Sequence, residues 1–153
     1  MAREVHIYGV AVQDFKDGPY DLLVSNPPYF PSAGSSAPNI ARRRSRQDHS
    51  LQPESLFTAA IKLLKPKGRL ALIWPYKNAD QLMRTALSLG FHLWERVIVR
   101  PMPQKPPHRI LFTFGLGEGN IRSSEMSIET NVHHTYSQEF AALTAPFYLP
   151  EEG

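Results

Sequence analysis

The stretch 20-YDLLVSNPPYF-30 joins a short apolar run to a series of residues that end a strand. Residues 21–24 have the composition of a buried strand, and the Asn-Pro pair that follows is a strong breaker. The two prolines fix φ twice and remove two backbone donors, and the first of them keeps Asn26 out of the helical region. A stiff segment at the carboxyl end of a strand therefore carries one amide side chain and one aromatic ring, an arrangement suited to holding a flat ligand.

The composition is that of a globular protein. The chain has 153 residues, of which 42% are hydrophobic and 20% are charged, and this suits one domain with a single core. It has no cysteine, which excludes disulfides and thiolate metal sites. No apolar run approaches the roughly 18 residues of a membrane-spanning helix, and the first ten residues lack the pattern of a secretory signal. We therefore expect a cytoplasmic protein with no membrane partner.

Strand and helix patterns alternate on both sides of the opening stretch. Residues 5–12 are apolar and partly β-branched, which is typical of a strand, and they lead to Asp14 and Phe15. The further predicted elements are a strand at 21–25, a helix with Pro53 in its first turn, a strand at 69–74, a helix between Asn78 and Gly90, antiparallel strands at 91–99 and 110–114, a short strand at 127–130, and a helix opened by a Thr135–Gln138 capping box. This order favours an open α/β sheet with a terminal antiparallel hairpin. Ligands of such sheets bind at the carboxyl ends of strands, where we expect both Asp14 and Asn26 to lie.

Residues 31–50 (PSAGSSAPNIARRRSRQDHS) are predicted to form a long basic loop, and loops of this length in compact domains usually bind or gate something. The loop concentrates four arginines, Arg42, Arg43, Arg44 and Arg46. A second basic group flanks the proline-rich segment 100–109 and consists of Arg96, Arg100, Lys105, His108 and Arg109. The loop arginines can neutralise RNA phosphates, or they can form an ordinary solvated surface. The net charge of +3 does not decide between these, and the neighbouring NPPY stretch favours RNA.

Three histidines raise the question of a metal site. His49, His133 and His134 lack a clear carboxylate–histidine pattern, so we expect solvated or core side chains and no bound metal. Trp74 and Trp94 are expected in the core.

With Asn26-Pro27-Pro28-Tyr29 after an apolar strand, the sequence resembles the amino-methylating class I S-adenosylmethionine methyltransferases. Further segments resemble the bacterial tRNA adenine-N6 methyltransferases that modify tRNA1(Val): the basic loop, LLKPKGRLALIWP at 63–75, the hairpin, and TYSQEFAALTAPFYL at 135–149. This resemblance implies that residues 1–153 are a single partial methyltransferase domain. It corresponds to the C-terminal portion of the class I, Rossmann-like sheet.

The resemblance also implies a part that the sequence does not contain. Members of the family begin with a glycine-rich turn that lets the backbone approach the cofactor, followed by an acidic residue for its ribose. The chain has no Gly-x-Gly pattern before Asn26, and GLGEG at 115–119 follows the hairpin. We therefore expect the N-terminal cofactor-binding half to be missing and S-adenosylmethionine binding by this chain alone to be weak or absent.

The resemblance assigns roles to individual residues. Asn26 and the backbone carbonyl of Pro27 accept hydrogen bonds from the target amino group, Pro28 completes the motif, and Tyr29 stacks on a base that lies outside any helical stack. Asp14 and Phe15 contact the adenine of the cofactor. The plainer alternatives are a strand-terminating turn at NPPY, a solvated acid at Asp14 and a core ring at Phe15.

Three functions remain open at this point. The first is methylation of an adenine amino group in tRNA, with this chain as a fragment of the enzyme. The second is methylation of a protein glutamine, since release-factor modifiers use the same motif. The third is a non-catalytic RNA-binding remnant. In each case, loss of the front half would leave the strand at 21–25 as an exposed sheet edge, through which we expect the chain to self-associate. The early strand around residues 6–12 would lose its neighbours altogether, so we expect it to be disordered, re-paired within the chain or paired with a second copy.

Overall fold

The computed structural model describes residues 4–27 and 52–148. The predicted loop at 31–50 lies outside these ranges, and so do Pro28, Tyr29, His49 and the four loop arginines Arg42, Arg43, Arg44 and Arg46.

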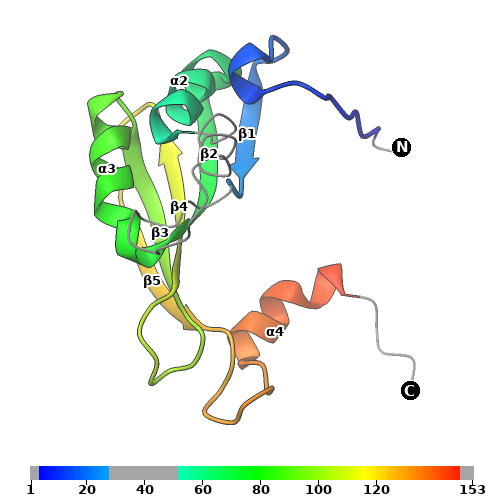
Figure 1. The fold of residues 1–153 in the computed structure, drawn as a ribbon, viewed down its shortest axis with the longest axis vertical. Coiled ribbons are helices and arrows are strands. Elements are labelled where there is room, and N and C mark those ends of the chain that lie inside the picture. The colour runs from blue at the N-terminus through cyan, green and yellow to red at the C-terminus, as the bar shows by residue number, and fades with distance from the viewer. Residues whose placement is uncertain (1–3, 28–51, 149–153) are drawn as a thin grey trace, which may run out of the picture.

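A five-stranded mixed sheet organises the described chain, in the order β1-β2-β4-β3-β5 (Figure 1). The strands are β1 (Tyr20–Ser25), β2 (Leu64–Pro75), β3 (His92–Arg100), β4 (Arg109–Gly115) and β5 (Arg122–Ser127). The helices are η1 (Val12–Asp14), α2 (Pro53–Leu63), η2 (Tyr76–Asn78), α3 (Ala79–Ser88), α4 (Gln138–Thr144) and η3 (Ala145–Phe147). β1 is parallel to β2, β4 is antiparallel to both β2 and β3, and β5 is parallel to β3. The predicted α/β class and its antiparallel hairpin are confirmed.

The hydrophobic core lies between one face of the sheet and the helices α2 and α3 (Figure 1). Phe57 of α2 is fully buried, and its ring centroid lies 5.0 Å from that of Phe91 and 5.4 Å from that of Phe114. Leu82 and Ala86 bring α3 into the same core. Apolar side chains at helical spacing thus fold two helices onto one layer of sheet.

Both helices have the ends that the sequence indicates, with two differences of detail. Pro53 stands at the first turn of α2, and Gly90 adopts a φ of 82°, a left-handed conformation that favours glycine after a helix. Asn78 holds the N-cap position of α3, but its side chain makes no capping hydrogen bond. The segment 65–68 does not separate helix from strand, because α2 ends at Leu63 and β2 begins at Leu64.

The strand pattern at 5–12 does not form a strand, which agrees with the expected loss of its neighbours. Residues 4–11 have no regular structure, and Val12 begins the short helix η1. Val5 is 85% exposed and Ile7 is 93% exposed. Extended backbone becomes a strand only when a neighbour satisfies its hydrogen-bonding groups, and no neighbouring strand for 4–11 occurs among the described residues.

The C-terminal segment differs from the sequence prediction in two positions. The strand expected at 127–130 lies earlier, at Arg122–Ser127, and joins the sheet as its outer strand. The helix cap is Ser137 and not Thr135, since the Ser137 hydroxyl accepts a hydrogen bond from the Phe140 amide at 3.1 Å. From this cap, α4 and η3 extend away from the sheet as a C-terminal arm (Figure 1).

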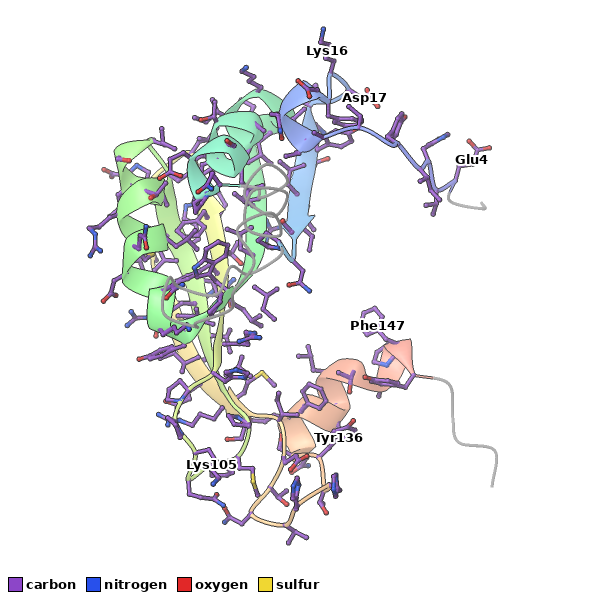
Figure 2. All side chains as sticks on the ribbon, viewed as in Figure 1. Glu4, Lys16, Asp17, Lys105, Tyr136 and Phe147 are labelled. Atoms are coloured by element: carbon purple, nitrogen blue, oxygen red, sulfur yellow. The ribbon has the colours of Figure 1, made fainter. Side chains whose placement is uncertain are left out.

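The arm consists of residues 128–148, and most of it is exposed. Figure 2 shows Tyr136 near its base and Phe147 at its outer end. Two hydrogen bonds tie it to the sheet: the Ser137 hydroxyl donates to Ser127 O of β5 at 2.5 Å, and the Ile128 amide donates to Arg100 O of β3 at 2.9 Å. Within the parts of the chain that the structure describes, no helix has the length and apolar character needed to cross a membrane.

Candidate functional site

The carboxyl end of β1 presents the first candidate residues. Ser25 pairs with Leu72, so the segment that follows β1 leaves the sheet beside the last residues of β2. Asn26 is exposed, whereas Pro27 is buried. A buried proline followed in sequence by another fixes the backbone, and the exposed amide before it offers a carbonyl oxygen as an acceptor. Two acceptors, the Asn26 side chain and the Pro27 carbonyl, thus belong to one stiff segment.

Asp14 and Phe15 lie at the other end of the same strand. They precede Tyr20, the first residue of β1, while Asn26 follows the last. A six-residue strand is about 17 Å long at a rise of about 3.3 Å per residue. The expectation that Asp14 and Asn26 share one edge of the sheet is therefore not met, because the strand that was to carry Asp14 there does not form.

Aromatic contacts hold Phe15 in its place. Its ring centroid lies 5.0 Å from that of Tyr8 in an edge-on contact and 6.2 Å from that of Tyr20 in a stacked one. Phe15 is half-buried and Asp14 is exposed. The ring packs against its own chain segment, so the plainer reading of Phe15 as a packing residue describes what the structure shows.

Among residues 4–27 and 52–148, the groups with shifted pKa values are a single pair, in the turn at the start of β1. Asp17 accepts hydrogen bonds from the Gly18 amide at 2.8 Å and from the Tyr20 hydroxyl at 3.0 Å. The Gly18 bond, and then the Tyr20 bond, lower the pKa of Asp17. Desolvation, and then the bond to Asp17, raise the pKa of Tyr20. These bonds fix the turn into β1 and are remote from Asn26.

The second basic group is largely engaged within the protein. Arg96 Nε donates to Ser123 Oγ at 2.9 Å, and Arg100 pairs with Glu125, so both arginines tie β3 to β5. A further guanidinium nitrogen of Arg100 donates to the Lys105 carbonyl at 3.0 Å. Arg96 and Arg100 therefore hold the outer strand β5 on the sheet. Lys105 is exposed on the hairpin loop (Figure 2).

Two groups of residues were missed from the sequence. Glu129, His133 and His134 bring their ligand atoms within 4.8 Å of one another, and His133 Nδ1 lies 2.9 Å from Glu129 Oε2. The i,i+4 spacing of Glu129 and His133 was the available signal. The two imidazole planes are nearly parallel, 11° apart, so their in-plane lone pairs do not converge unless one ring turns. The absence of a bound metal stays a prediction.

The second missed group consists of Trp94 and the glycines of the segment 115–119. Trp94 donates from Nε1 to the Gly117 carbonyl at 2.8 Å, and a Cβ added at Gly115 would lie 2.1 Å from its indole. The segment GLGEG at 115–119 therefore accommodates the Trp94 side chain. Trp74 packs against the core as expected, whereas Trp94 is half-buried and lies outside the core cluster.

Curated relatives match almost the whole chain. It is 35% identical over 145 residues to a tRNA1(Val) (adenine(37)-N6)-methyltransferase of Aeromonas salmonicida, a match that covers 95% of this chain and 61% of the relative. Proteins of the same name match in Trichodesmium erythraeum (37% identity, 85% of this chain, 54% of the relative) and Yersinia enterocolitica (34% identity, 97% and 59%). The resemblance drawn from the sequence is confirmed. The chain spans only 54% to 61% of the length of these three relatives.

A solved structure supports the fold. A predicted O-methyltransferase from Agrobacterium tumefaciens aligns with a TM-score of 0.61 at 16% identity, over 82% of this chain and 51% of that one. At this identity the likeness concerns the fold, which is thus of the class I methyltransferase kind. No family model matches the chain.

Proposed function

We propose that the chain supplies the base-binding part of an S-adenosylmethionine-dependent methyltransferase that modifies the exocyclic amino group of an adenine in tRNA. The observation that carries the proposal is the Asn26-Pro27 segment at the carboxyl end of β1, in a chain whose relatives are named tRNA adenine-N6 methyltransferases. The exposed amide and the fixed backbone support it.

The chemistry of the target explains why two acceptors suit it. An exocyclic adenine nitrogen is a poor nucleophile because its lone pair is delocalised into the ring. Hydrogen bonds from its two protons to the Asn26 side-chain oxygen and the Pro27 carbonyl would favour a more tetrahedral nitrogen. Its lone pair would attack the methyl carbon of the sulfonium donor as the carbon–sulfur bond breaks, and the methylated nitrogen would release one proton to solvent. No strong base is required, and most of the acceleration comes from alignment. Tyr29, which lies outside the described residues, is proposed to stack on the base, and Pro28 to keep the segment stiff.

The described residues do not form a site for the methyl donor. Asp14 and Phe15 are proposed to hold the cofactor adenine, but they lie at the opposite end of β1 from Asn26, and Phe15 packs on Tyr8 and Tyr20. Their assignment requires residues 4–19 to approach the carboxyl end of β1. We therefore infer that this chain alone binds S-adenosylmethionine weakly or not at all.

RNA is the proposed macromolecular partner, and the cytoplasm is the proposed location. Arg42, Arg43, Arg44 and Arg46 would contact phosphates beside the base-binding segment, which gives affinity that falls as salt rises. A protein glutamine as substrate has weaker support, because the relatives' names specify a tRNA.

A second copy of the chain is a further proposed partner. β1 is an outer strand of the sheet, so one row of its backbone hydrogen-bonding groups is unpaired within the described sheet. We propose that the isolated chain pairs through this edge, most simply as a two-fold dimer. Light scattering at micromolar concentration checks this, and a monomer contradicts it.

Methyl transfer from labelled donor to tRNA tests the function. The chain is fused behind the part of the Aeromonas salmonicida relative that it does not match, and the fusion is expected to methylate tRNA. Asn26→Ala should then lower turnover by about 100-fold, as expected when a reacting group is misplaced, with cofactor affinity nearly unchanged. Asn131→Ala, at an exposed asparagine of the arm, is the matched control and should keep full turnover. Full turnover in Asn26→Ala would remove Asn26 from the mechanism.

A further inference from the structure

We propose that exposed residues along the carboxyl edge of the sheet form a second RNA-binding surface, the edge strip, which holds nucleotides that flank the target adenine. The edge strip consists of Tyr76, Lys77, Lys105 and His108. This inference rests on the proposed function for its ligand, RNA, while its residues are separate from the Asn26–Pro27 segment.

The strand directions bring the edge strip to the same edge of the sheet as Asn26. β1, β2 and β3 run in one direction and β4 runs in the other, so the β3–β4 loop lies at the edge where β1 ends. Figure 1 shows this loop beyond the end toward which the β1 arrow points. Ser25 pairs with Leu72, and Pro75 lies about 10 Å further along β2 at a rise of about 3.3 Å per residue. The edge strip therefore begins at Tyr76 near the Asn26 segment and continues away from it.

Backbone hydrogen bonds join the two segments that carry the edge strip. The Tyr76 amide donates to the His108 carbonyl at 3.2 Å, although the two residues are far apart in the sequence. The His108 amide donates to the Val99 carbonyl at 3.0 Å, which closes the base of the β3–β4 loop. Tyr76 and His108 therefore hold fixed positions next to each other at the end of β2.

The loop that presents Lys105 is stiff. Its prolines are Pro101, Pro103, Pro106 and Pro107, and each fixes φ. The Lys105 amide donates to the Met102 carbonyl at 3.0 Å, and the Arg100 guanidinium donates to the Lys105 carbonyl at 3.0 Å. The Lys105 side chain is exposed on this loop (Figure 2). Because its backbone is already ordered, a contact through Lys105 costs less entropy than one on a flexible loop.

The chemistry of the edge strip suits unpaired nucleotides. The ammonium groups of Lys77 and Lys105 can contact phosphates, and an imidazole N–H of His108 can donate to a phosphate oxygen. The ring of Tyr76 is exposed and can stack on a base. The target adenine has to lie outside a helical stack, so the bases beside it are accessible to such a ring. A cationic strip with one aromatic ring is an arrangement that binds single-stranded RNA.

The charges at this edge favour RNA over a protein partner. Lys77, Lys105 and the half-buried Arg109 lie along it. Glu125 of β5 is paired with an arginine of β3, and the first turn of α3 contributes Asp80. The sum of these charges is positive. Protein interfaces are depleted of lysine, whereas RNA phosphates require cations.

Binding of a fluorescently labelled tRNA transcript to this chain, without a methyl donor, tests the lysines. Lys77→Gln and Lys105→Gln should each weaken binding by about fivefold at about 0.1 M salt and reduce the slope of log affinity against log salt by about 0.7. Lys62→Gln and Lys67→Gln are matched controls, because both lysines are exposed near the amino end of β2, at the opposite edge. The controls should change neither quantity, and Lys105→Arg should keep the binding of the unaltered chain.

The ring and the imidazole give a second measurement that salt does not confuse. Tyr76→Ala should weaken binding at least about fivefold through lost stacking, with the salt slope unchanged, and Tyr76→Phe should retain it. His108→Ala should weaken binding by about fivefold through one lost hydrogen bond. Tyr8→Ala, at an exposed tyrosine remote from the carboxyl edge, is the control and should have no effect.

The edge strip and the Asn26 assignment can fail separately. Asn26→Ala should leave tRNA affinity nearly unchanged, so the role of Asn26 is read from turnover of the fused enzyme and the edge strip from affinity alone. Equal effects of Lys105→Gln and Lys67→Gln, or an unchanged salt slope when Lys77→Gln and Lys105→Gln are combined, would overturn the edge strip. Absence of tRNA binding by this chain at low salt would also overturn it, in favour of a protein partner at this edge.

Discussion

The β3–β4 hairpin and the segment 4–19 are both rich in apolar side chains, and only the hairpin buries them. Phe112 and Phe114 of β4 are buried under α2 and α3, with neighbouring strands on both sides. Val5 and Ile7 have the same chemical character and face solvent. The difference shows that an apolar run forms a strand only when neighbouring strands pair with its backbone. An apolar composition permits a strand but is not sufficient for one. Two sets of substitutions test this contrast, and two further sets test the C-terminal arm and the turn into β1.

The largest difference should come from one ring in the core beneath the hairpin, Phe57 of α2, and one ring in the segment 4–19, Tyr8. Phe57→Ala removes a fully buried ring that contacts Phe91 and Phe114, and it should lower the free energy of unfolding by about 3–5 kcal/mol. Tyr8→Ala removes an exposed ring whose partner is Phe15, and it should cost at most about 1 kcal/mol. Urea denaturation of both variants measures the contrast. Equal losses would mean that the segment 4–19 is as firmly packed as the core.

Replacing a glycine with alanine should distinguish the packed hairpin from the segment 4–19 nearly as clearly. Gly115→Ala places a Cβ against the Trp94 indole and should cost about 1–3 kcal/mol through overpacking. Gly9→Ala in the segment 4–19 and Gly117→Ala beside the tryptophan meet nothing within 4 Å and should be close to neutral. Denaturation followed by tryptophan fluorescence reads the effect. A neutral Gly115→Ala would show that the indole has room to move.

The C-terminal arm should respond at an intermediate level. Ser137→Ala removes the cap of α4 and a hydrogen bond from the Ser137 hydroxyl to the Ser127 carbonyl, at a cost of about 1 kcal/mol. Amide exchange at Phe140 should accelerate accordingly. Thr135→Ala, at the position that the sequence suggested as the cap, should change little. If Thr135→Ala destabilised the protein more than Ser137→Ala, the predicted capping box of Thr135 and Gln138 would be correct after all.

The smallest effect concerns the turn into β1. The pKa of Asp17 lies below its ordinary value of 3.8, so the stabilisation from its two hydrogen bonds is present above that pH and is lost as the pH falls through the lowered pKa. Asp17→Asn should remove this acid-dependent step in a nuclear magnetic resonance titration of Gly18. Glu4→Gln, at an exposed carboxylate in the same segment, should leave it in place. A step that persists in Asp17→Asn would belong to another group.

Short-range sequence signals predicted the helices and the hairpin, because neighbouring residues along the chain determine them. Helical spacing located α2 and α3, Gly90 marked the end of α3, and the hairpin followed from two apolar runs around a proline-rich segment. These signals did not predict which strands pair with each other. β5 has the sequence RSSEMS, with four exposed residues and no apolar alternation, and it joins the sheet through backbone bonds and arginine contacts to β3.

The candidate site divides in the same way. Asn26 at the end of a strand followed from the Asn-Pro breaker, because that signal is local. Asp14 depended on a strand at 5–12, and with no neighbour for that strand among the described residues the prediction of its position failed. Glu129 lies near His133 and His134 because an isolated bridge pairs it with Tyr136, so the i,i+4 spacing of Glu129 and His133 indicated their proximity without its cause.

The regular pairing of β2 from Arg69 to Leu72 has a consequence for how the gene can change. Over these residues the strand is paired with β1 on one side and β4 on the other, so no residue is left over to absorb a change in length. One codon inserted after Leu70 would shift the following residues by one position, and such a shift exchanges the two faces of a strand. Ala71 would then take the place of Leu72 in the core. Residues 65–68 lie opposite the register shift between Tyr20 and Leu22, so insertions and deletions should be tolerated there and purged within 69–72.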